Sequence, residues 1–297
     1  MLELTVKEMF AMVSLHGQDS TRLGLGGQMT GRALAACDVV SDQIDQFGTE
    51  AFMNVLKEAV KAAKAISTKN CMKIMQEMYQ ELHDQNLMEE RRSLLASDMI
   101  NVEAGVDIKD WCAQEQTYRC IVEGFRSEML EETEPNAECA ILFWLFRESC
   151  MLNELFSTAE QKEIEQKVVG LAACSSSWKT LHEEKFCDAL SGVGLQVLKA
   201  KHKLFENPYL EGVTLIFPFL ERRNTVFIDL VVVGSSVKDR REKVVEYLTS
   251  RGHHVEVVKN GSESLLCIDG SYYRIFPTSR RAYKVPVQGV SLIPVYR

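Results

Sequence analysis

A short glycine-rich segment contains the residues best suited to bind a charged ligand. Residues 16–31 read HGQDSTRLGLGGQMTG and are expected to form a flexible loop, since glycine and small polar residues favour loops. Exposed backbone amides at the start of a helix attract anions. The sequence therefore predicts a site for an anion or an anionic headgroup at Arg22, Gly26, Gly27 and Arg32. A plain loop is the alternative, and a nucleotide-binding loop is disfavoured because no strand precedes the segment and no Gly-Lys-Ser/Thr follows it.

A second group of candidate residues lies near the C-terminus and is basic. Paired arginines occur at Arg240 and Arg241 and again at Arg280 and Arg281. Clustered arginine side chains attract acidic protein surfaces and nucleic acid. They predict, as an alternative function, a regulatory protein-interaction or nucleic-acid-binding module in the C-terminal part. Ordinary solvated surface is the simpler interpretation of the same residues.

The remaining residues with catalytic or metal-binding side chains do not form a known motif. His253 and His254 are adjacent, and neighbouring residues of a strand point to opposite faces, which disfavours a shared metal ion. Asp229 interrupts the apolar run FIDLVVV and is expected to face solvent at a strand edge. Nucleophile-elbow and zinc-protease patterns are missing from the sequence. We therefore expect no catalytic residue, no metal and no cofactor, and a protein that is not an enzyme.

Composition and charge narrow the class of protein. The chain has 297 residues, of which 46% are hydrophobic, and a formal net charge of −8. This acidic balance lacks the basic footprint of nucleic-acid-binding proteins, so nucleic acid is not the expected partner. Nine cysteines without a CxxC pair are typical of a reducing compartment, and no apolar stretch reaches the roughly 20 residues that span a bilayer. The sequence thus predicts a cytoplasmic protein, with peripheral membrane binding as an extension of the anionic-headgroup site.

One strongly apolar stretch is expected to form the centre of the fold. Asn136 to Phe156 reads NAECAILFWLFRESCMLNELF, and its apolar residues continue at helical spacing after the polar step. Pro135 suits the start of a helix, and Asn136 or Thr133 is placed to cap it. A helix that is apolar on all sides must be enclosed by other helices.

The character of the sequence changes near residue 205. Beyond this point, strand-like runs occur at Val213–Phe219 and Thr225–Val233, and a helical pattern follows over Ser236–Arg251. The fold class expected is a mainly α-helical N-terminal domain with a small α+β C-terminal domain. The predicted boundaries are residues 1–204 and 205–297.

The central stretch resembles the signature helix of the Golgi phosphoprotein family, whose members are effectors of phosphatidylinositol 4-phosphate and include many bacterial relatives. The matching residues are AILFWLFRESCMLNELF. LTVKEMFAMVSLHG is similar to the opening helix of the family, GGQMTGRALAAC to its loop and next helix, and ELHDQNLMEE to the segment before its small hairpin. Glu160–Ala173 and Phe186–Lys199 resemble its closing pair of helices.

The resemblance implies a helical Golgi-phosphoprotein-like fold over residues 1–200 and a headgroup site on it. The family binds the headgroup with a loop tryptophan, an arginine at the start of the next helix, and an arginine pair at the head of the central helix. Arg32 matches the single arginine, while the loop has no tryptophan and the pair is replaced by Ala137 and Glu138. The function expected is that of a non-enzymatic binding or adaptor protein, with an anionic lipid headgroup or a protein as partner.

Overall fold

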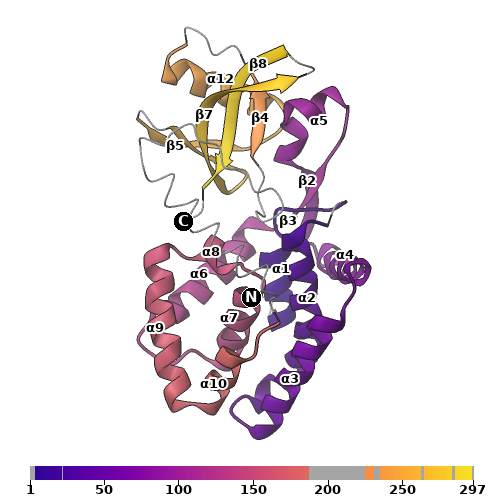
Figure 1. Cartoon of the computed structure of the whole chain (residues 1–297), viewed down its shortest axis with the longest axis vertical. Helices are drawn as coiled ribbons and strands as arrows, with labels where there is room; N and C mark the ends of the chain where they lie inside the picture. The colour runs from indigo at the N-terminus through magenta and orange to yellow at the C-terminus, as the bar shows by residue number, and fades with distance from the viewer. Residues whose placement is uncertain are drawn as a thin grey trace. The chain divides into compact units, whose positions relative to one another are not determined.

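The chain divides into two compact units, which Figure 1 shows in a computed structural model. The model describes residues 4–21, 23–186, 225–230, 235–261, 264–282 and 285–295. The first unit comprises Met1–Glu90, Trp111–Leu195 and Arg297, and the second comprises Arg91–Asp110 and Gln196–Tyr296. The N-terminal part is helical and the C-terminal part contains a separate β-sheet, as the sequence predicts. The expected boundary near residue 205 lies outside the described residues.

The first unit is built mainly of helices. In chain order its elements are α1 (Val6–Leu15), β1 (Gln18–Asp19), α2 (Leu25–Val40), the 3-10 helix η1 (Ser41–Gln46), α3 (Glu50–Ala65), α4 (Thr68–Asp84), α6 (Glu115–Leu130), α7 (Ala137–Glu148), α8 (Leu152–Leu155), α9 (Thr158–Cys174) and α10 (Ser176–Glu183). Strands β2 (Met88–Arg92) and β3 (Lys109–Ala113) carry the chain between the two units. With β1 they form a small sheet in the order β1-β3-β2. The predicted helix Phe186–Lys199 lies almost entirely outside the described residues.

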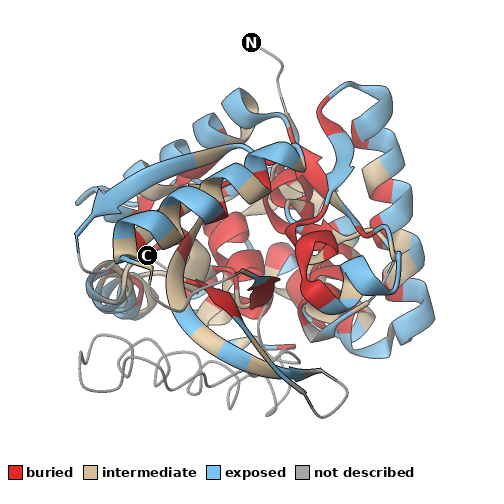
Figure 2. Cartoon of the chain, turned by 90° about the horizontal axis from the view of Figure 1, so that it is seen from above, coloured by how far each residue is buried: buried red, intermediate tan, exposed pale blue. Residues whose placement is uncertain are grey.

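Helix α7 forms the centre of the first unit, which confirms the prediction of an enclosed apolar helix. Its residues Cys139 to Phe146 are all buried, and Figure 2 shows exposed residues on the outward sides of the surrounding helices. The Phe146 ring lies 5.4 Å from the ring of Phe10 on α1 and 5.0 Å from the ring of Phe125 on α6. Asn136 is the N-cap, since its side-chain oxygen accepts a 2.8 Å hydrogen bond from the amide of Cys139.

The predicted continuation of this helix to Phe156 is wrong. Helix α7 ends at Glu148, and Cys150 has a positive φ of 61°. The Ser149 hydroxyl donates a 2.8 Å hydrogen bond to the carbonyl of Leu145. Serine competes for backbone carbonyls in this way, and a left-handed residue ends a helix. The apolar spacing that suggests one long helix therefore belongs to two helices separated by a turn.

The predicted flexible loop over residues 16–31 is also partly helical. Helix α2 begins at Leu25, so Gly26 and Gly27 lie in its first turn rather than in a loop. A Cβ atom at Gly31 would lie 2.5 Å from Cys71 Cβ, and one at Gly27 would lie 2.8 Å from Leu23 Cδ1. These glycines permit close packing of α2, which outweighs their low helix propensity.

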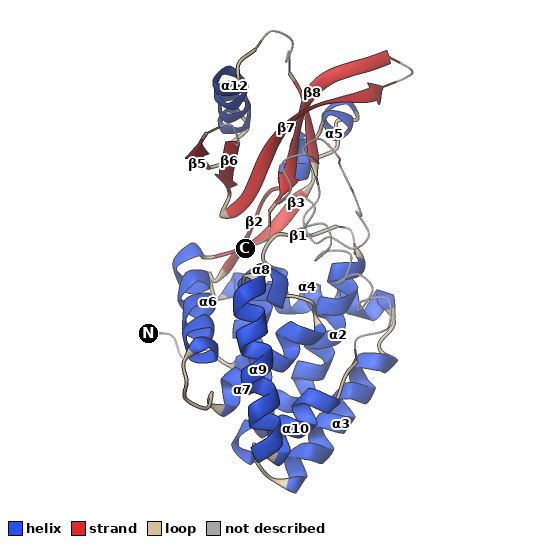
Figure 3. Ribbon diagram, turned by 60° about the vertical axis from the view of Figure 1, so that its left-hand side comes forward, coloured by secondary structure: helices blue, strands red, loops and turns tan. Residues whose placement is uncertain are grey.

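The second unit is an antiparallel sheet with helices packed against it (Figure 3). Its elements are the 3-10 helix η2 (Leu94–Ser97), α5 (Met99–Glu103), β4 (Val226–Asp229), α12 (Val237–Ser250), β5 (Val255–Asn260), β6 (Ser264–Ile268), β7 (Ser271–Ala282) and β8 (Val285–Pro294). The described strands follow the order β4-β8-β7-β6-β5. Leu94 of η2 joins Leu248 of α12 and Leu266 of β6 in the core of this unit. The predicted strand Val213–Phe219 lies outside the described residues.

Candidate functional site

The first turn of α2 begins without a side-chain cap among the described residues. Its N-cap is Gly24, with φ −77° and ψ −178°, and no hydrogen bond from a side chain caps the turn. A Cβ atom at Gly24 would have no neighbour within 4 Å, so there is open space beside the N-cap. The first amides of a helix lack partners within the helix and face the positive end of its dipole. This turn can therefore accept an anionic group.

A buried amide lies beside the same turn. Gln18 on β1 is only 9% exposed, and its Nε2 atom has no hydrogen-bond acceptor among the residues that the structure describes. Its Oε1 atom lies 3.6 Å from the position of a Cβ at Gly27. The preceding Gly17 amide donates a 2.8 Å hydrogen bond to the Trp111 carbonyl, which fixes the short strand. Because a buried donor without an acceptor is costly, the Gln18 amide suits an acceptor supplied from outside the chain.

The carboxylate next to Gln18 is held by its own turn. Asp19 Oδ1 accepts hydrogen bonds of 2.7 Å from both the amide and the hydroxyl of Thr21. Such a side-chain turn orients the carboxylate toward the chain that follows it. This negative charge weakens the attraction of the region for an anion, and the amide donors must outweigh it.

The residues predicted for the anion site are only partly brought together. Gly26 and Gly27 share the first turn of α2 and are buried, whereas Arg32 lies seven positions after Leu25, the first residue of the helix, and is half-buried. Seven helical residues correspond to about 10 Å along the axis. Burial raises the pKa of the Cys71 thiol on α4, and the Arg32 guanidinium partly offsets this rise, so Arg32 lies on the side facing α4. Arg22 lies outside the described residues.

The basic residues of the second unit are mostly engaged within it. Arg280 Nη1 lies 3.1 Å from Asp98 Oδ2, and its guanidinium stands 5.7 Å from the centre of the Phe227 ring. Arg240 donates a 3.3 Å hydrogen bond to the Ser235 carbonyl, and Arg241 a 3.4 Å bond to the Asn260 carbonyl. Arg281 is exposed on β7. Three of the four arginines therefore already have contacts within the second unit, which makes them less available to a partner than the sequence suggests.

A polar chain that the sequence analysis did not identify links Ser97, His253 and Asp269. Ser97 Oγ lies 3.1 Å from His253 Nε2, and His253 Nδ1 lies 2.7 Å from Asp269 Oδ2. This is the order of hydrogen bonds in serine hydrolases. Ser97 is fully buried, however, and His253 is only 5% exposed. The arrangement joins η2 to the turn between β6 and β7. Because Ser97 is buried, a substrate cannot reach its hydroxyl.

The adjacent histidines His253 and His254 lie in different environments. His254 is exposed and His253 is buried, although both precede β5 rather than lying within a strand. Groups of three or more histidine, cysteine, aspartate or glutamate side chains suited to a metal ion do not occur among the described residues. Asp229 is exposed at the end of β4, a terminal strand of the described sheet, which confirms its predicted position.

The comparisons with known proteins give no further guide to this chain. No protein-family model matches it, and neither the curated proteins nor the solved structures contain a significant match. Among the described residues, no helix is both long enough and apolar enough to cross a membrane.

Proposed function

We propose that the protein is a non-enzymatic binding or adaptor protein that holds an anionic group at the first turn of α2. The observation that supports this most directly is the buried Gln18 amide, which lacks an acceptor within the described part of the chain and lies beside the uncapped turn. A phosphate oxygen there would accept from Gln18 Nε2 and from the amides around Gly26. The Golgi-phosphoprotein-like fold suggested by residues 1–200 is part of the same proposal.

The ligand class proposed is a phosphorylated headgroup, either on a membrane lipid or free in solution. Arg32 is the one position that matches the headgroup ligands of the family resembled, and from about two turns into α2 it adds positive potential without direct contact. The net charge of −8 opposes general adhesion to anionic membranes. Peripheral membrane association would therefore depend on this site rather than on bulk charge.

A flotation experiment tests the proposal with vesicles of phosphatidylcholine alone or with added phosphatidylinositol 4-phosphate or phosphatidylserine. We expect co-flotation only with an anionic lipid, and a loss of about tenfold in affinity for Gln18→Leu, because a hydrogen bond to a charged group is removed. Lys57→Glu on α3 is a matched control for Arg32→Glu, because Lys57 is exposed and lies on a different helix. Arg32→Glu should weaken binding and Lys57→Glu should not.

A solution titration separates a lipid from a free phosphate as the source of the anion. Inorganic phosphate and inositol phosphate are added while the amide NMR signals of Gly26, Gly27 and the Gln18 side chain are followed. Shifts with either compound but no flotation would indicate a soluble ligand. Neither flotation nor shifts would show that the proposed site is wrong.

The alternative function, partner binding through the C-terminal arginines, makes a different prediction. It requires salt-dependent binding that disappears when Arg240, Arg241, Arg280 and Arg281 are changed. Because three of these side chains already have contacts within the second unit, the geometry favours the α2 site.

A further inference from the structure

Strand β5 ends the sheet of the second unit and carries exposed valines. It is the last described strand on its side of the sheet, next to β6. Val257 is 41% exposed and Val258 is 51% exposed. The outer edge of an end strand presents backbone N–H and C=O groups that can pair with another strand. Apolar side chains on such an edge favour its being covered.

A β-bulge places two opposite charges of β5 on the same face of the sheet. Glu256 pairs with Cys267 and Lys259 pairs with Leu265, with the register shift between Val257 and Lys259. Cys267 and Leu265 alternate with the buried Leu266, so both point away from the core. Glu256 and Lys259 therefore share the outer face. Without the extra residue they would point to opposite faces.

We propose that β5 pairs antiparallel with β5 of a second copy of this chain. In this pairing Glu256 lies opposite Lys259 of the second copy, and Lys259 lies opposite Glu256 of the second copy. A two-fold axis normal to the sheet passes between the Val257–Val258 segments, so that four exposed valines meet there. Each copy has the same two residues, Val257 and Val258, between Glu256 and Lys259. The two strands can therefore pair residue by residue in spite of the bulge.

The charges of β5 distinguish this pairing from a protected edge. Proteins often use charges and bulges to prevent strands from joining at sheet edges. A single sign of charge would repel a second copy, whereas Glu256 and Lys259 have opposite signs at self-complementary positions. Opposite charges directly across antiparallel strands attract, and like charges repel. Charge complementarity thus identifies a second copy as the occupant of this edge.

Sedimentation velocity on charge-reversal variants tests the proposal. The unmodified chain is expected to be a dimer at micromolar concentration. Lys259→Glu places two pairs of like charges across the interface and should raise the dimer dissociation constant by about tenfold or more. The double variant Glu256→Lys with Lys259→Glu restores opposite charges and should restore the dimer. Lys179→Glu, an exposed residue of α10 in the first unit, has the same change in net charge and should leave the dimer intact.

Each outcome decides the proposal. A monomer at 100 μM protein, on the order of the highest concentration used for such measurements, would overturn it. A dimer that is unaffected by Lys259→Glu would place the interface elsewhere and would also overturn it. Thermal unfolding of each variant shows that it is folded, which separates a lost interface from a lost fold. Recovery of the dimer in the double variant has no explanation other than the paired charges of β5.

Discussion

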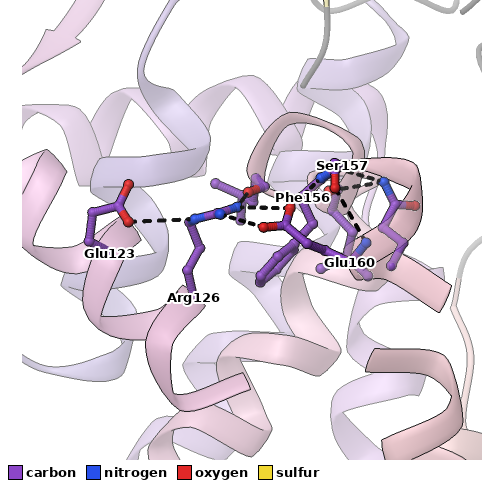
Figure 4. Close-up of polar contacts among 8 residues, drawn as sticks. Glu123, Arg126, Phe156, Ser157 and Glu160 are labelled. Carbon is purple, nitrogen blue, oxygen red and sulfur yellow. Dashed lines mark hydrogen bonds and ion pairs between the residues drawn. The ribbon is translucent and has the colours of Figure 1, made fainter. Parts of the chain in front are cut away.

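At the scale of single residues, Arg126 of α6 connects three parts of the first unit (Figure 4). Its Nη2 atom donates a 2.7 Å hydrogen bond to Glu160 Oε1 on α9, and its Nη1 atom donates to the Leu155 carbonyl at the end of α8. The guanidinium also stands 5.2 Å from the centre of the Phe156 ring. Glu160 in turn accepts from the Ser157 amide at 2.7 Å and completes the capping box of α9. One cation therefore fixes both the end of α8 and the start of α9.

This contact predicts how stability depends on pH. The Arg126 hydrogen bond is the largest cause of the lowered pKa of Glu160, which falls to about 2. Because the folded pKa is below the unfolded value, the ionised carboxylate stabilises the fold above about pH 4.5, and this stabilisation is lost as the pH falls toward 2. Glu160→Gln should be less stable than the unmodified chain at pH 6. The difference in the free energy of unfolding, measured in urea, should become smaller by about 1–2 kcal/mol at pH 3, after allowance for solvent screening.

Glu163→Gln provides the control for this prediction, because Glu163 is exposed on the same helix. Its effect on the free energy of unfolding should be small at both pH values. A difference between Glu160→Gln and the unmodified chain that stays constant from pH 6 to pH 3 would contradict the proposed role of the ionised carboxylate.

Residue types identify part of the candidate site in the sequence and miss the rest. Gly26 and Gly27 are recognisable because glycine-rich helix starts commonly bind anions. Gln18 has no sequence signal, since its significance lies in a buried amide that lacks an acceptor. Ser97 and His253 are 156 positions apart, and no motif spacing links them. Such contacts depend on tertiary packing, which a local pattern does not encode.

At the scale of elements, the packing of α2 against α4 depends on Gly31. A Cβ atom there would lie 2.5 Å from Cys71 Cβ and 2.8 Å from Cys71 Cα, so the two helices must separate to admit it. Gly31→Ala should therefore destabilise the first unit by about 1–3 kcal/mol, even though alanine is the better helix former. Chemical denaturation measures the change.

Gly170→Ala on α9 is the matched comparison. A Cβ atom at Gly170 would have no neighbour within 4 Å, and its backbone is helical. This substitution should raise stability by about 0.5–1 kcal/mol, because alanine restricts the unfolded chain. Equal effects of the two substitutions would show that helix propensity, rather than close packing, governs Gly31.

Elements with local end signals are predicted well, and those that depend on packing are not. The helix expected over Ser236–Arg251 is α12, with Ser236 as N-cap and Gly252 at φ 89° beyond its end. Helix α9 likewise has a serine N-cap, because the Ser157 hydroxyl accepts a hydrogen bond from the Glu160 amide. The end of α7 was not predictable from spacing, because the apolar residues continue past it. The helical start of α2 was missed because glycine is usually a loop signal.

At the scale of the whole molecule, the second unit is discontinuous in sequence. Residues 91–110, which run from the end of β2 to the start of β3, belong to the second unit, although residues of the first unit precede and follow them. Asp98 links this segment to the C-terminal strands, because its Oδ2 accepts a 2.8 Å hydrogen bond from the Phe227 amide, 129 positions away. Its Oδ1 caps α5 by accepting a hydrogen bond from the Ile100 amide. The sequence shows only a short polar and apolar stretch there, so a continuous domain from residue 205 was the natural expectation.

This organisation predicts that a substitution within residues 91–110 lowers the stability of the C-terminal strands. Asp98 is 5% exposed and binds both the Phe227 amide and Arg280. Asp98→Ala leaves the Phe227 amide without its acceptor and should destabilise the second unit by about 2–3 kcal/mol. Hydrogen exchange should then show faster exchange in α5, β4 and β7, because these elements lose a shared partner.

Amide exchange in the first unit serves as an internal reference for this experiment. Amides of α7 in the first unit should keep their protection, since the core of that unit contains none of residues 91–110. Asp107→Ala serves as the control, because Asp107 is exposed within the same segment. Faster exchange confined to residues 91–110 would contradict a shared unit. Faster exchange that reaches β4 and spares α7 requires that residues 91–110 and the C-terminal strands unfold together.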